Sequence, residues 1–265
     1  MIYFMQIAGM FLIPFIAVLV PILIGQRYGT NTRKKPGELP HTPVGSVVGA
    51  AFGLLAFMLA FTFQIAANRY DARRQLLLEE VTQIRTAYLR AGLIPEPYRS
   101  NTKKLLVEYV DLRVGNLADR SVLNHVFIRS QQILDSLWKY AEALAEQDRS
   151  SEVYALYITT VNEMVDAYNQ RIAMGLQYRI PASVLFVLFI ITFLSMLILG
   201  YQFGISGKSN LKINLLLAII FAVAMFLIIA LDRPELGISR LSQKPMHNLQ
   251  EQLHGKQLNV DRIIP

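Results

Sequence analysis

The stretch VGSVVGAAFGLLAFMLAFTF at residues 44–63 decides the fold, because its only polar side chains are Ser46 and Thr62 and it carries no charge. A helix that rises about 1.5 Å per residue needs about 20 apolar residues to cross a bilayer. Uncharged apolar runs of similar length occupy residues 2–25, 182–200 and 213–231. The sequence therefore predicts an all-α integral membrane protein with four transmembrane helices.

The second of these runs is followed directly by QIAANRYDARRQLLLEEVTQIRTAYLR at residues 64–90, which contains no glycine or proline. Its apolar side chains recur at helical spacing, so one helix is expected from about residue 43 to residue 89, leaving the bilayer near Asn68. Further helices are expected at 98–114, 119–147 and 152–178, and the last should continue past Pro181 into the third span. The insertion is thus predicted to be a helical extramembrane domain built on extensions of spans two and three.

These boundaries divide the chain into four regions. Residues 1–66 hold transmembrane helices one and two, and residues 67–180 form the helical extramembrane domain. Residues 181–232 hold transmembrane helices three and four, and residues 233–265 are a polar C-terminal tail. Within the tail, residues 242–254 have the pattern of a short amphipathic helix.

The composition excludes several classes of function. With 53% hydrophobic residues and a mean hydropathy of +0.36, the chain is typical of membrane proteins. It has no cysteine, which excludes disulfides, thiolate metal sites and a cysteine nucleophile. The net charge of +7 fits contact with lipid headgroups better than contact with nucleic acid, because no basic run is interleaved with aromatic residues. Neither a glycine-rich phosphate loop nor a G-x-S-x-G elbow occurs, so we expect no enzyme activity and no cofactor.

Four stretches carry a resemblance to a known family, namely residues 60–100, 161–181, 199–210 and 231–250. The first contains RYDARR at 69–74, just past a span, and the last contains DRP at 232–234. Together they resemble the bacterial bestrophin-like membrane family, which is named for its similarity to bestrophins, anion channels with four spans per subunit around a central pore.

The resemblance implies a homo-oligomeric ion channel, anion-selective and with a pentamer favoured, in the bacterial inner membrane. It also implies that the large helical domain lies in the cytoplasm. This chain lacks the acidic calcium ligands that bestrophins carry near the tail, where Asp232 and Glu235 are the nearest candidates, so calcium gating is not implied. The alternatives are a non-conducting membrane scaffold or sensor whose helical domain recruits a partner, and a transporter. The transporter is disfavoured because no charge lies inside a span.

A row of residues along the second span is the candidate pore lining. Small residues recur every four positions, and large aromatic ones follow them toward the helical domain. One interpretation is a pore with a wide glycine end and a phenylalanine constriction that gates by dewetting. The other is helix packing, with the phenylalanines against lipid or a neighbour. A period of four also drifts around a helix of 3.6 residues per turn, so the row cannot all face one axis unless the helix bends or tilts. The row is Gly45, Gly49, Gly53, Phe57, Phe61 and Ile65, and Gln64 beside its end joins the first five as the candidate pore-lining residues.

Three arginines follow this row, Arg69, Arg73 and Arg74. Around a symmetry axis they would form rings of positive charge at a pore mouth and concentrate anions. The alternative is a basic anchor that contacts lipid headgroups.

Acidic residues near the spans are candidates for structural ion pairs. Asp232 ends the fourth span and should have a partner, for which we favour a basic residue of span two or of the extramembrane extensions of spans two and three. The alternative is a solvated helix end. Glu163 and Asp166 lie three residues apart on the helix at 152–178. We expect them to pair with Arg69, Arg73 or Arg74, and the alternative is that they hold a cation. A zinc site at His247, Glu251 and His254 is the less favoured interpretation of the amphipathic tail segment.

Overall fold

The computed structural model describes residues 2–34, 43–114, 120–176, 179–207, 210–233 and 241–255, and Glu235 lies outside them. The described residues form α-helices and one short 3-10 turn, with no strand among them. In chain order the helices are α1 (Ile2–Arg33), α2 (Val44–Arg90), α3 (Tyr98–Val114), α4 (Arg120–Gln147), α5 (Glu152–Leu176), α6 (Ala182–Ser206), α7 (Leu211–Asp232) and α8 (Lys244–Leu253).

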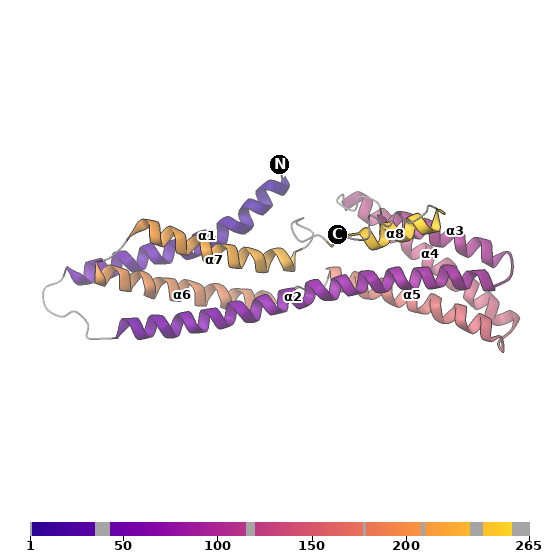
Figure 1. The fold of residues 1–265 in the computed structure, drawn as a ribbon, viewed down its shortest axis with the longest axis horizontal. Coiled ribbons are helices and arrows are strands. Elements are labelled where there is room, and N and C mark those ends of the chain that lie inside the picture. Colours follow the sequence, from indigo (N-terminus) through magenta and orange to yellow (C-terminus); the bar gives the residue numbers. More distant parts are fainter. Residues whose placement is uncertain are drawn as a thin grey trace. The chain divides into compact units, whose positions relative to one another are not determined.

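The chain divides into two compact units, and the long helix α2 contributes to both (Figure 1). Unit 1 comprises Met1–Asp71 and Arg179–Arg240, and unit 2 comprises Ala72–Tyr178 and Leu241–Pro265. The four predicted spans are confirmed: each lies within a helix that contains a segment long and apolar enough to cross a membrane, namely Ile7–Arg33, Val44–Leu93, Ala182–Ser206 and Leu211–Asp232. The single helix predicted from residue 43 to residue 89 corresponds to α2.

In unit 1 the helices α1, α6 and α7 pack around a core that also receives one face of α2. Val18, Ile22, Leu55 and Met196 are fully buried there. Helices α1 and α6 cross at glycines: Gly25 and Gly29 of α1 face Gly200 and Gly204 of α6 across backbone contacts that leave no room for a side chain. Small residues four apart on both helices permit this close approach.

A single methyl group at this crossing is expected to be costly. A Cβ at Gly200 would overlap the backbone of Ile22, whereas a Cβ at Gly49 of α2 would meet nothing within 4 Å. We therefore expect Gly200→Ala to lower the free energy of unfolding by about 1–3 kcal/mol, as overpacking does in tight cores. The matched variant Gly49→Ala should leave stability equal or slightly higher, because alanine is the better helix former. Thermal unfolding of both variants in the same detergent tests this, and equal midpoints would contradict it.

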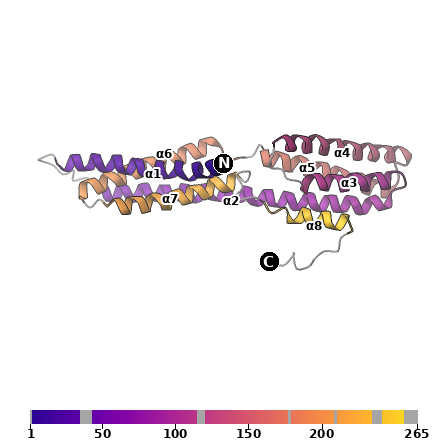
Figure 2. The ribbon, with the colours of Figure 1, turned by 90° about the horizontal axis from the view of Figure 1, so that it is seen from above.

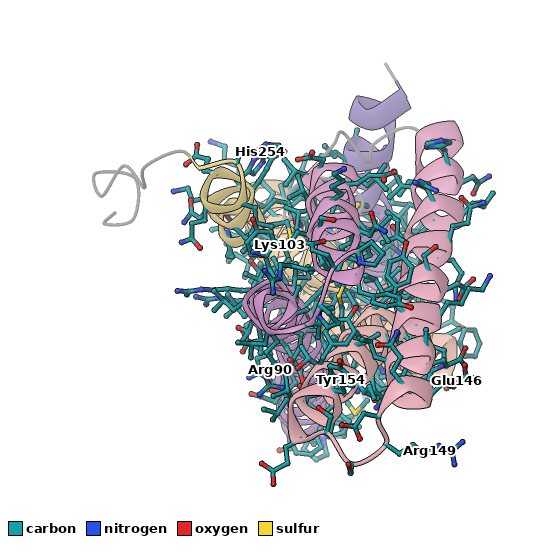
Figure 3. The ribbon with its side chains drawn as sticks, turned by 90° about the vertical axis from the view of Figure 1, so that its right-hand side faces the viewer. Arg90, Lys103, Glu146, Arg149, Tyr154 and His254 are labelled. Carbon is teal, nitrogen blue, oxygen red and sulfur yellow. The ribbon has the colours of Figure 1, made fainter. Side chains whose placement is uncertain are left out.

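In unit 2 the second half of α2 packs with α3, α4, α5 and α8 (Figure 2). The core of unit 2 contains fully buried side chains from all five helices. Arg90, labelled in Figure 3, lies at the end of α2. It donates to the Leu156 carbonyl oxygen at 2.9 Å and to the hydroxyl of Thr160, and these bonds join α2 to α5. The predicted tail helix is confirmed as α8, whose Met246 and Leu249 are buried in this core.

One predicted connection is wrong. The helix before Pro181 was expected to continue into the third span, but α5 ends at Leu176 and α6 starts afresh at Ala182. Pro181 has ψ 133°, an extended rather than helical value, and it takes the N-cap position of α6. Proline disfavours helical geometry in the residue before it and lacks the N–H that a continuous helix would need. Among the described residues, only α2 therefore continues from a span into unit 2 as one helix.

Candidate functional site

Helix α2 is the span that the rest of the chain covers least. In the most apolar stretch of each span, 11% of the α2 residues are buried, against 28%, 22% and 33% in α1, α6 and α7. One face of α2 holds the buried residues Leu55, Thr62 and Ala66 and packs in unit 1. The opposite face is exposed in the described part of the chain, and it consists largely of glycines, phenylalanines and the amide residues Gln64 and Asn68.

The predicted pore-lining residues all lie on exposed positions of α2. Phe57 is 65% exposed and Phe61 is 52% exposed. Their rings stack at a centroid distance of 6.4 Å with planes 12° apart. One turn further, the side-chain amide of Gln64 donates to Asn68 Oδ1 at 2.6 Å. The two rings and the two amides thus form one ordered strip along the helix.

In the part of the chain that the structure describes, the glycines of this row do not serve close helix packing. Gly49 and Gly53 have open space where a side chain would stand, and a Cβ at Gly45 would only meet the Gln202 amide at 3.4 Å. The close helix crossing lies instead at α1 and α6, which the sequence pattern of span two did not indicate. The G-x-x-x-G spacing at 25–29 and at 200–204 was the available signal.

The three arginines after this row differ in exposure. Arg73 is buried, with 6% of its surface exposed, Arg69 is half-buried, and Arg74 is exposed. A buried guanidinium presents little charge to ions in solution, so Arg74 fits the expected pore-mouth role best of the three. That role stays a prediction for this row.

The predicted ion-pair acids take different positions. Asp232 is buried at the end of α7, where its carboxylate accepts the Ile180 backbone N–H at 2.9 Å, next to the N-terminus of α6. A helix N-terminus favours negative charge, which explains an acid at this boundary. Glu163 and Asp166 are exposed on α5, and Asp166 accepts a hydrogen bond from Asn162 at 3.3 Å. The pairing of these acids with basic side chains stays a prediction.

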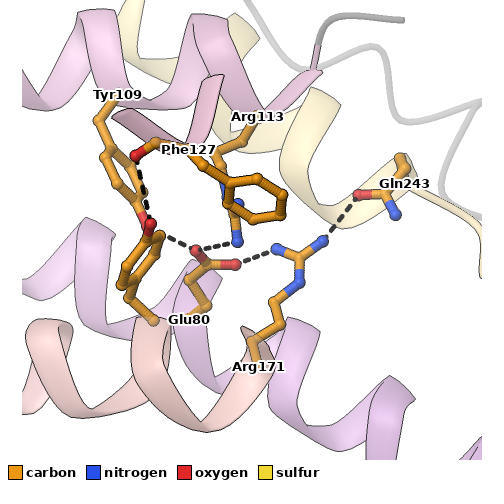
Figure 4. Close-up of polar contacts among 7 residues, drawn as sticks. Glu80, Tyr109, Arg113, Phe127, Arg171 and Gln243 are labelled. Atoms are coloured by element: carbon orange, nitrogen blue, oxygen red, sulfur yellow. Dashed lines mark hydrogen bonds and ion pairs between the residues drawn. The ribbon is translucent and has the colours of Figure 1, made fainter. Parts of the chain in front are cut away.

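A buried charge cluster in unit 2 was not anticipated from the sequence. Glu80 of α2 is fully buried and accepts hydrogen bonds from the Tyr109 hydroxyl at 2.7 Å and from Arg113 at 2.8 Å (Figure 4). Arg171 of α5 also pairs with Glu80, and its other nitrogen donates to Gln243, just before α8, at 3.4 Å. We call Glu80, Tyr109, Arg113 and Arg171 the Glu80 cluster.

The electrostatics of the cluster follow from its geometry. Burial alone would raise the pKa of Glu80, but the attraction of Arg113 and Arg171 and the hydrogen bond from Tyr109 outweigh it, so this pKa is lowered. Burial, together with the neighbouring carboxylate, raises the pKa of Tyr109 well above its ordinary value. Glu80 therefore stays ionised and Tyr109 stays a donor near neutral pH. The cluster joins α2, α3, α5 and the start of α8.

A sequence signal for this cluster existed. Glu80 falls three residues after Leu77 and four before Ile84, both buried, so it interrupts the apolar stripe of α2. Arg113 interrupts the stripe of α3 in the same way, four residues after Tyr109. A charge on an apolar stripe needs an opposite charge facing it.

The structure describes the surroundings of His247 and His254, the two histidines of the zinc hypothesis. His254 Nε2 lies 2.9 Å from Asp111 of α3, and Gln250 donates to the same carboxylate oxygen at 2.7 Å. His247 is exposed on another part of α8, and no group of three metal-ligating side chains occurs among the described residues. In this structure the polar residues of α8 thus attach the helix to α3.

Comparisons with known proteins agree on one fold. The family model for the Bestrophin-like domain matches residues 12–246. Two crystal structures of single-residue variants of a bacterial bestrophin homologue from Klebsiella pneumoniae are similar. One is 16% identical, with a TM-score of 0.62 over 94% of this chain and 99% of that chain. The other is 15% identical, with a TM-score of 0.63 over 94% and 98%.

A crystal structure described only as a membrane protein, again with a single substitution, is 14% identical with a TM-score of 0.66. It covers 91% of this chain and 98% of that chain. At these identities the likeness shows the fold alone. No curated protein matches the chain.

Proposed function

The chain belongs to the bestrophin-like family, and we propose that it forms a homo-oligomeric ion channel whose pore is lined by α2. The observation that carries the proposal is the uncovered face of α2, where glycines, two stacked phenylalanines and two amides follow one another. Gln64 lies before the point near Asn68 where α2 is expected to leave the bilayer. A polar side chain at that depth favours a water-filled lumen or a protein neighbour over lipid.

The phenylalanines would form the narrow part of this pore. Phe57 and Phe61 lie one turn apart, and repetition around an axis would place two apolar rings in series. Such a constriction passes ions only when it is wide enough to hold water. The glycine end would be wide, because it carries no side chains.

The proposal requires an oligomer, because one copy of α2 cannot enclose a pore. Closed cyclic symmetry is the usual way to repeat one face, and the family resemblance favours a pentamer. We expect native mass spectrometry in mild detergent to give about four subunits or more. With neighbouring helices about 8–10 Å apart, about four copies of α2 are the fewest that leave an open space at their centre. A monomer or a dimer would contradict the proposal.

We place the protein in the bacterial inner membrane with unit 2 in the cytoplasm, as the family resemblance favours. Lipid then covers the exposed apolar side chains of α1, α6 and α7, such as Ile13, Phe186 and Leu216. The permeant species are small ions. The sign of their charge is a separate question. The family resemblance favours anions, and a pore mouth lined by Arg74 would favour them too.

The direct test of the proposal is conduction by the purified protein. Reconstituted in vesicles under a salt gradient, it should carry a salt-dependent current that empty vesicles lack. A non-conducting scaffold whose unit 2 recruits a partner is the alternative, and it predicts no current from any assembled variant.

A further inference from the structure

We propose that Asp71 is the residue of α2 that sets the charge preference of the pore, and that this preference is for cations. The proposal rests on the proposed function, because it needs α2 to line a shared axis. It adds to that function the residue that discriminates between ions and the sign of the ion it favours.

The argument starts from the register of one continuous helix. Successive residues of an α-helix are turned by about 100°, so residues seven apart lie almost above one another. Relative to Phe57, this places Phe61, Gln64, Asn68 and Asp71 within a sector of about 80°. All five positions are exposed. The first charged side chain on the strip that begins with the phenylalanines is therefore an aspartate.

The arginines lie in other directions. By the same geometry Arg69 is turned from Phe57 by about 120° and Arg73 by about 160°. This agrees with their burial, since Arg73 is 6% exposed and Arg69 is half-buried. Arg74 is turned by about 100° to the other side, toward the flank of the helix. If the stacked phenylalanines face an axis, no arginine of this segment faces it with them.

The electrostatic consequence is a ring of carboxylates. Asp71 is exposed and lies ten residues beyond Phe61, about 15 Å along the helix, where the pore would open. One copy per subunit places several like charges around one opening. Rings of aspartate or glutamate are the usual device of cation-selective pores, because they raise the local concentration of cations. The amides of Gln64 and Asn68 lie between this ring and the phenylalanines and could replace part of an ion's water shell.

The test measures the permeability ratio of potassium to chloride from the reversal potential under a potassium chloride gradient. The full-length protein is reconstituted in vesicles of one neutral phospholipid, so that lipid charge does not contribute. We expect the unsubstituted protein to favour potassium. Asp71→Asn should lower the ratio by about tenfold, the lower end of what a charged opening contributes. Asp71→Lys should favour chloride.

Two control variants show whether a charge other than that of Asp71 sets the ratio. Glu142→Gln removes an exposed acid from α4 and should leave the ratio unchanged. Arg74→Gln removes the exposed arginine, and we expect it to raise the ratio by less than Asp71→Asn lowers it. A larger effect of Arg74→Gln, or a chloride preference of the unsubstituted protein, would assign selectivity to the arginine and overturn the proposal.

The outcome also distinguishes this inference from the function on which it rests. Current that persists with the same ratio in Asp71→Asn leaves the channel intact and refutes the role of Asp71. Assembled protein without current, both unsubstituted and with Phe57 and Phe61 changed to alanine, refutes the channel and with it this inference.

Discussion

Replacing Glu80 by glutamine is expected to lower the free energy of unfolding of the full-length protein by about 3–5 kcal/mol, the usual cost of removing one partner from a buried ion pair. Glutamine has nearly the same shape and can still accept the Tyr109 hydroxyl. It cannot balance Arg113 and Arg171, which would both remain in the interior of unit 2 without a counter-charge. The loss is therefore one of charge and not of volume.

The measurement can be confined to unit 2. Trp138 of α4 is the only tryptophan of the chain, so its fluorescence during denaturation reports the unfolding of this unit. The matched variant Glu79→Gln changes the neighbouring exposed acid and should alter stability by no more than about 0.5 kcal/mol. Equal losses in both variants would mean that the Glu80 cluster contributes nothing of its own.

The same carboxylate predicts how stability depends on pH. The pKa of Glu80 is lower in the folded protein than its ordinary value of 4.5. Its contribution is therefore fully present above that value and is lost as the pH falls through the lower, folded-state pKa. Glu80→Gln should remove this part of the acid destabilisation, so the stability difference between variant and unsubstituted protein should shrink at acidic pH.

Changing both Phe57 and Phe61 to alanine is expected to increase ion flux strongly in reconstituted vesicles. Two large rings per subunit would disappear from the narrowest part of the pore, and a wider apolar passage stays wet more easily. Both side chains are more than half exposed in the single chain, so their loss leaves no cavity in the core of unit 1. The effect should appear as larger conductance or as leak without a stimulus.

The alternative interpretation predicts a different result on the same sample. If the two rings pack against neighbouring subunits, the double variant should destabilise the oligomer, since truncation of a buried phenylalanine costs about 3–5 kcal/mol. Phe186→Ala, which removes an equally exposed ring from α6, is the control and should change neither flux nor assembly. An intact oligomer with unaltered flux would rule out the phenylalanine constriction.

Local chemistry was enough to predict most of the helices. An apolar run of about 20 residues has one stable form in a bilayer, because backbone N–H and C=O groups find no partner there except within a helix. The pattern of apolar side chains on 64–90 extended α2 in the same way, and the amphipathic pattern of residues 242–254 predicted the tail helix. The prediction that α5 continues past Pro181 was wrong, because a proline disfavours helical geometry in the residue before it.

The partners of individual side chains depended on tertiary structure. The local sequence does not predict that Glu80 will face Arg113 and Arg171, which lie 33 and 91 residues later in the chain. A pairing of these charges depends on how the three helices pack together. The glycines that permit a close helix crossing also depend on tertiary structure. Glycines four residues apart occur in α1, α6 and α2, but only α1 and α6 pack closely at them, whereas Gly49 and Gly53 of α2 have open space around them.

The sequence by itself determined the spans, the long helix α2 and the composition of its faces, because these follow from the solvent and from helical periodicity. Only the tertiary structure decided which face of α2 stays uncovered and which arginine is buried, because burial is a property of the neighbours that a residue acquires when the helices pack.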